Sequence, residues 1–201
     1  MTPPGGFVTN ELLALLQTAG TDWTFSRDVD VFIGLAGIAG VFVGFAALIG
    51  LSRDDDVDAA RFIDIRGVVT IGLLIIVVAL VPVILGRYGL VDHALWLTSS
   101  LVFLTLLWTV MFYGMRRPEN RAAMRAQAKA APRLYVFFWV AGETPIQVSL
   151  LLIVFGVLPE FEPALYLTAL VFQLFEAAYV LSELVYWRIG STKVMEDSNQ
   201  P

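Results

Sequence analysis

Five long apolar segments follow one another along the chain, separated by short polar links or links that contain Pro or Gly. They cover residues 31–51, 67–86, 94–115, 134–158 and 164–187. Each reaches about 20 residues, the length that an α-helix needs to cross the roughly 30 Å hydrocarbon core of a bilayer. No internal repeat or second domain is visible. The sequence therefore predicts an all-α integral membrane protein, in which the whole chain forms one domain with five transmembrane helices.

The residues before the first span do not resemble a cleaved signal peptide. Residues 1–20 have no basic n-region and carry Glu11 within their apolar part. The four leucines between positions 12 and 16 form a one-sided stripe that is too short to span a bilayer. We expect residues 9–19 to form a short interfacial helix, which lies on the membrane or on a neighbouring subunit. A tail without regular structure is the alternative.

Lys and Arg residues are distributed unevenly between the two sides that five spans define. Of the 13 cations, three lie in residues 52–66, six in residues 116–133 and two after the last span. The opposite side holds only Arg27 and Arg87. Because cytoplasmic loops carry an excess of Lys and Arg, the N-terminus is predicted outside and the C-terminus in the cytoplasm, in a bacterial inner membrane.

Composition narrows the chemistry that the chain can carry. Hydrophobic residues make up 58% of the sequence and charged residues only 15%, whereas soluble domains carry about 25% charged residues. There is no cysteine, which excludes disulfides, thiolate metal centres and cysteine nucleophiles. The single histidine, His93, argues against a histidine-ligated haem pair. The net charge of −5 gives no sign of nucleic-acid binding. No cofactor is expected, and no residue pattern indicates an enzyme.

Two glutamates and two glutamines interrupt the last two spans at matching depths. Glu143 and Glu176 lie about 14 and 16 Å from the cytoplasmic ends of their spans. Gln147 and Gln173 lie 13 and 14 residues from the same boundary. Because the link 159–163 is short, the two spans are expected to be antiparallel neighbours. The sequence therefore predicts a polar ladder, in which the glutamates face each other and the glutamines face each other.

Carboxylates at this depth need a partner. An ionised side chain at the bilayer centre costs about 2.5–3.5 kcal/mol on insertion scales. No Lys or Arg is expected at the depth of Glu143, so the pair should share a proton, bind a cation or face water. Pro145 leaves the carbonyl of Ala141 without its helical donor, which adds an oxygen ligand. With Glu183 as the cytoplasmic mouth, these groups predict an oligomeric channel or transporter for cations or protons.

The same residues also fit a structural role. Glutamine and protonated glutamate hydrogen-bond between membrane helices, for about 0.6 kcal/mol per contact. In that interpretation, the ladder only joins two helices, and the protein is a non-catalytic membrane scaffold or sensor subunit. Binding of a small ligand is a third interpretation.

The first two spans carry different packing signals. In the first span, Ala36, Gly40 and Gly44 recur every four residues, a spacing that lets helix backbones approach closely. This contact can lie within the subunit or across a homo-oligomer. The second span is apolar on all sides apart from Thr70. That pattern predicts a helix that faces lipid, with a kink at Pro82.

Two cytoplasmic loops carry clusters of charge. Residues 118–131 predict a short basic helix, on which three cations are spaced four apart: Arg121, Arg125 and Lys129. Each cation near an anionic lipid surface contributes about 1 kcal/mol, so this helix is a candidate site for anionic lipid. Ordinary enrichment of cytoplasmic loops in cations is the alternative.

The second cluster is acidic and is a weak candidate for a divalent metal. Asp54, Asp56 and Asp58 have alternating carboxylates, as a calcium loop has. An EF-hand loop would also need a glycine and a later glutamate, but Ala59 and Ile65 stand at those positions. Helix capping or contact with the basic helix explains the same aspartates.

Overall fold

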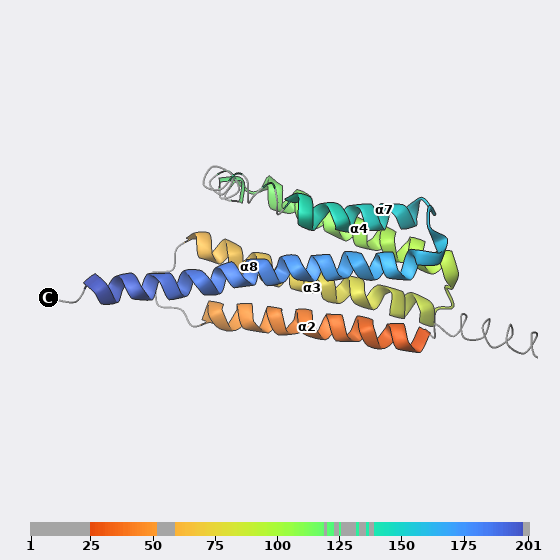
Figure 1. Cartoon of the computed structure of the whole chain (residues 1–201), viewed down its shortest axis with the longest axis horizontal. Coiled ribbons are helices and arrows are strands. Elements are labelled where there is room, and N and C mark those ends of the chain that lie inside the picture. The colour runs from red at the N-terminus through yellow and green to blue at the C-terminus, as the bar shows by residue number, and fades with distance from the viewer. Residues whose placement is uncertain are drawn as a thin grey trace, which may run out of the picture.

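The computed structural model describes residues 25–51, 59–118, 120–122, 125, 132, 136 and 139–198. Every element in this part of the chain is a helix, which confirms the all-helical prediction. The long helices are α2 (Phe25–Leu51), α3 (Ala59–Arg87), α4 (Asp92–Arg116) and α8 (Glu162–Ser198). The short elements are a π-helical turn, η1 (Trp139–Glu143), then α7 (Thr144–Val154), and a 3-10 turn, η2 (Pro159–Phe161). The helices lie side by side in one elongated bundle (Figure 1).

Four helices are long and apolar enough to cross a membrane, as in a multi-pass membrane protein: Val29–Leu51, Ile65–Arg87, Asp92–Arg116 and Pro159–Ser182. The predicted span 134–158 corresponds to a shorter apolar helix, Val140–Val154. The count of five spans and the orientation of the chain therefore stay predictions. The predicted interfacial helix 9–19 and most of the predicted basic helix 118–131 lie outside the described residues.

The two ends of the bundle differ in the helix connections and helix ends that lie there. At the first, which we call the His93 end, α3 passes into α4 and α7 passes into α8. At the other, which we call the Ser198 end, α8 continues beyond its neighbours (Figure 1). With 37 residues, α8 is about 55 Å long, nearly twice the thickness of a hydrocarbon core.

The helix α3 packs against three neighbours, α2, α4 and α8, so the prediction that it faces lipid fits only part of its surface. Its fully buried residues are Val68, Ile75, Val78, Ala79 and Pro82. Leu73, Val77 and Ile84 are exposed and leave an apolar face outside the bundle. A helix that is apolar all round suits a protein core as well as lipid, and α3 has both kinds of face.

Gly72 allows α2 to approach α3 closely. A Cβ atom at this position would lie 2.5 Å from Cγ2 of Val43 and 3.3 Å from the carbonyl oxygen of Ala39. The predicted small-residue stripe behaves differently. Nothing lies within 4 Å of a Cβ built on Gly40 or Gly44, so these two glycines have no helix of the described chain against them. A close contact there would involve residues outside the described part of the chain or another molecule.

Four aromatic side chains meet in the half of the bundle nearest the His93 end. The Tyr166 ring centroid lies 6.0 Å from that of Phe32, 5.7 Å from that of Trp96 and 5.9 Å from that of Phe103. All four side chains are at most 9% exposed. We call these residues the aromatic cluster. It joins α2, α4 and α8.

A hydrogen bond ties the aromatic cluster to α3. The Tyr166 hydroxyl donates to the carbonyl oxygen of Val78 at 2.7 Å. Pro82 stands four residues after Val78 and has no N–H, so this carbonyl lacks its usual helical donor. Tyr166 supplies the donor from α8 and keeps the buried carbonyl satisfied.

Candidate carboxylate site in the membrane

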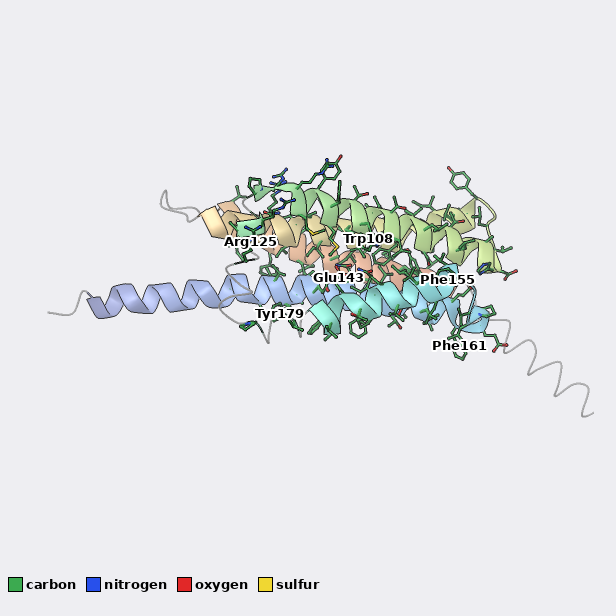
Figure 2. The ribbon with its side chains drawn as sticks, turned by 90° about the horizontal axis from the view of Figure 1, so that it is seen from above. Trp108, Arg125, Glu143, Phe155, Phe161 and Tyr179 are labelled. Atoms are coloured by element: carbon green, nitrogen blue, oxygen red, sulfur yellow. The ribbon has the colours of Figure 1, made fainter. Side chains whose placement is uncertain are left out.

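Two carboxyl groups approach each other where η1 lies against α8. Oε1 of Glu176 would be 2.5 Å from a Cβ atom at Gly142, so only glycine leaves room for this carboxyl group. Glu143 is the next residue and is close enough for its charge to act on Glu176. Glu143 lies near the middle of the bundle's length (Figure 2). The two glutamates therefore stand at the matching depths that the sequence indicates.

The hydrogen bonds at this site run along each helix rather than across the pair. Nε2 of Gln147 donates to Oε2 of Glu143 at 3.3 Å. Nε2 of Gln173 donates to Oε2 of Glu176 at 3.1 Å. Each glutamine thus holds the glutamate of its own helix. The predicted contact between the two glutamines is replaced by these contacts, because side chains three or four residues apart are neighbours on one helix.

Burial leaves two acceptor oxygens of the site without a donor. Glu176 is 5% exposed and Gln173 is 2% exposed, whereas Glu143 and Gln147 are half-buried. Within the described chain, Oε1 of Glu176 and Oε1 of Gln173 have no hydrogen-bond partner. The described residues also place no Lys or Arg within ion-pair distance of either carboxyl group. A buried carboxylate without a partner is costly, so the site has the chemistry to take up a proton or a cation.

The backbone beside the carboxyl groups is irregular. The π-helical turn Trp139–Glu143 ends next to Pro145, which sits in the first turn of α7. Because proline has no N–H, a carbonyl of this turn lacks its donor: Val140 in π-helical register or Ala141 in α-helical register. Such a carbonyl adds an uncharged oxygen next to Glu143. π-helical turns occur frequently at functional sites.

The other sequence-predicted ligands are not brought to this site in the described part of the chain. The Glu183 side chain lies outside the described residues, and so do Asp54, Asp56 and Asp58. Among the described residues, no group of three or more His, Cys, Asp or Glu side chains is placed to hold a metal ion.

The predicted lipid-binding cations are described only in part. Nε of Arg121 donates to the carbonyl oxygen of Met115 at 2.5 Å, so this side chain folds back on the end of α4. Arg125 is exposed, and Lys129 lies outside the described residues. Binding of anionic lipid there stays a prediction.

An ion pair at the His93 end was not predicted from the sequence. Nδ1 of His93 lies 2.5 Å from Oε1 of Glu162, which joins the first turn of α4 to the first turn of α8. The Glu162 side chain is 2% exposed and the His93 side chain is 48% exposed. The histidine ring also packs beside Gly156, whose φ of +61° makes the turn after α7. The sequence did indicate that this contact was possible, because the predicted topology puts the link before α4 and the link before α8 on the same side of the membrane.

Comparison of the chain with protein-family models, with curated proteins and with solved structures finds no match. A function for this chain is therefore inferred from the chemistry of the site itself.

Proposed function

We propose that the protein is a membrane channel or transporter for cations or protons, in which Glu143 and Glu176 bind the ion. One observation carries the proposal. The buried carboxyl group of Glu176 lies beside that of Glu143. One oxygen of Glu176 has no hydrogen-bond partner, and no cationic side chain of the described residues pairs with either group. Intramembrane carboxyl groups of this kind mark ion pathways and proton relays in other membrane proteins.

The donor set suggests which ions fit. It consists of carboxyl, amide and backbone carbonyl oxygens, the ligands that hard cations prefer. Two adjacent carboxylates repel each other in a medium of low dielectric constant, and a proton or cation between them relieves that repulsion. Gln147 and Gln173 orient the two groups through one oxygen each. The second oxygen of each carboxyl group is thereby left for the ion.

The alternative is a scaffold or sensor subunit, in which the polar residues only hold two helices together. That role calls for hydrogen bonds between α7 and α8. The hydrogen bonds of the four site residues instead run within each helix, which supports ion binding. We propose further that the protein acts as a homo-oligomer in a bacterial inner membrane, with the outward Gly40 and Gly44 of α2 as a contact between copies.

Flux into liposomes tests the proposal. Purified wild-type protein would be compared with Glu143→Gln, Glu176→Gln and, as a matched control, Glu160→Gln, which replaces an exposed glutamate of η2. We expect cation or proton flux in the wild type and the control, and a loss of at least tenfold in either site variant. A helix-joining role predicts that the amide preserves function. Absence of flux in the folded wild-type protein would contradict the proposal.

A further inference from the structure

Burial along α8 is asymmetric about the carboxylate site. On the side of the His93 end, seven residues recur every three or four positions and are at most 5% exposed: Glu162, Tyr166, Ala169, Leu170, Gln173, Glu176 and Ala177. This spacing places them on one stripe of the helix. Beyond Ala177, the described side chains at positions 178–182 and 185 are half-buried or exposed. The buried stripe thus ends at the site.

The stripe between the site and the His93 end has no free ligand for an ion. Tyr166 and Gln173 are seven residues apart, or about 10 Å along the axis. Between them lie the fully buried Ala169 and Leu170, which have no polar side-chain atom. The Tyr166 hydroxyl is already engaged by the Val78 carbonyl. An ion leaving Glu176 in this direction would therefore lose its ligands.

Side chains from the surrounding helices close the same stretch. The aromatic cluster brings Phe32 from α2, Trp96 and Phe103 from α4, and Tyr166 from α8. The helix α7 adds three fully buried side chains, Ile146, Leu150 and Ile153. The layer also buries three serines, Ser99, Ser100 and Ser149, but among the described residues it holds no charged side chain. Largely apolar constrictions of this kind act as gates in channels.

The opposite side of the site is less enclosed. Glu143 is half-buried, and Tyr179, one turn beyond Glu176 on α8, is 36% exposed. Glu143 and Tyr179 both lie nearer the Ser198 end than Phe155 and Phe161 do (Figure 2). The irregular backbone at η1 also lies here. Non-helical backbone at membrane depth is tolerated where it lines a hydrated cavity or is buried in protein.

We propose that, in this conformation, the carboxylate site exchanges ions only with the Ser198 end, and that the aromatic cluster seals it from the His93 end. The inference rests on the proposed function, because it specifies the side from which that ion enters. By the distribution of loop cations, the Ser198 end is the cytoplasmic side. Transport across the membrane then requires the aromatic cluster to open.

The natural absence of cysteine makes a direct test possible. Ala178→Cys and Ala169→Cys are compared, because Ala178 is half-buried just beyond the carboxylate site and Ala169 is fully buried on the stripe of α8. Proteoliposomes would be treated from one side at a time with a small cationic methanethiosulfonate that does not cross membranes and reacts only with hydrated thiols. Tyr88→Cys and Ser198→Cys calibrate the orientation of the protein.

We expect Ala178→Cys to react at least tenfold faster from the Ser198 end than from the His93 end, and Ala169→Cys to react from neither. Adding Tyr166→Ala should open Ala169→Cys to reagent from the His93 end. Labelling of Ala178→Cys from the His93 end or from neither side, or labelling of Ala169→Cys from the His93 end without Tyr166→Ala, would overturn the proposal. If Ala178→Cys does not fold, the half-buried Ser182→Cys replaces it.

Labelling does not depend on transport, so the two proposals fail separately. One-sided labelling together with no flux in the wild type would contradict ion transport and leave the seal intact. Flux that Glu176→Gln removes, together with labelling from the wrong side, would contradict the seal and leave the ion site intact.

Discussion

Glu162 and Glu176 lie on the same buried stripe of α8 and differ in what they meet. They are 14 residues apart, or about 21 Å, and are 1% and 5% exposed. Glu162 pairs with His93, whereas Glu176 faces Gly142 and leaves one oxygen unpaired. Burial is thus common to both glutamates, and the partner is what separates them. The Glu162 carboxyl group has a side-chain partner that joins two helices, whereas Glu176 has an oxygen free to bind an ion.

The comparison also extends to the glycines beside the two glutamates. Gly156 has a positive φ, so its conformation explains the choice of glycine in the turn after α7. Gly142 lies in a helical turn and needs no such conformation. The Glu176 carboxyl group occupies the space of its missing side chain. Gly156 is needed for the backbone conformation of the turn, and Gly142 is needed for the space that the Glu176 carboxyl group occupies.

The largest expected effect is on transport, from Gly142→Ala. The new Cβ would meet Oε1 of Glu176 at 2.5 Å and force the carboxyl group away from Glu143. We expect ion flux into liposomes to fall at least tenfold. Gly67→Ala is the matched control, since nothing lies within 4 Å of its new Cβ. Equal flux in both variants would show that the approach of Glu176 to the η1 turn has no part in transport.

The next effect is on stability and separates the two glutamates directly. His93→Ala leaves the buried Glu162 carboxyl group without its hydrogen-bond partner, and we expect unfolding in detergent to become easier by about 2 kcal/mol. Adding Glu162→Gln to His93→Ala should recover most of this loss, because the buried acid is gone. Glu176→Gln should leave the stability unchanged within about 0.5 kcal/mol or raise it, since it removes a buried acid that has no cationic partner. A large destabilisation by Glu176→Gln would contradict this distinction between the two glutamates.

The depth of the site could be predicted from the sequence, and its contacts could not. The rise of 1.5 Å per residue and the short link 159–163 place Glu143 and Glu176 at similar depths without any structure. Which glutamine bonds to which glutamate depends on rotamers, and intrahelical neighbours compete with those across the pair. The role of Gly142 depends on the distance between two helices, which no periodicity encodes.

Helix positions show the same limit. The apolar pattern identifies α3 as a helix, but it describes a core helix and a lipid-facing helix equally well. Its place against α2 follows from contacts such as Gly72 with Ala39 and Val43, which are distant in sequence. Close packing at Gly40 and Gly44 stays a prediction, since no described helix covers these two glycines.

The smallest expected effect concerns the seal rather than the site. Tyr166→Phe keeps the ring in the aromatic cluster and removes only the donor to the Val78 carbonyl. Because Pro82 has no N–H, that buried carbonyl is then left without its helical donor and without Tyr166, at a cost of about 1 kcal/mol. Tyr88→Phe, at an 81% exposed position, should leave unfolding unchanged. If the seal depends on packing of the ring, Tyr166→Phe keeps Ala169→Cys closed to reagent from the His93 end, whereas Tyr166→Ala opens it. Opening by Tyr166→Phe alone would show instead that the hydrogen bond to α3 holds the cluster shut.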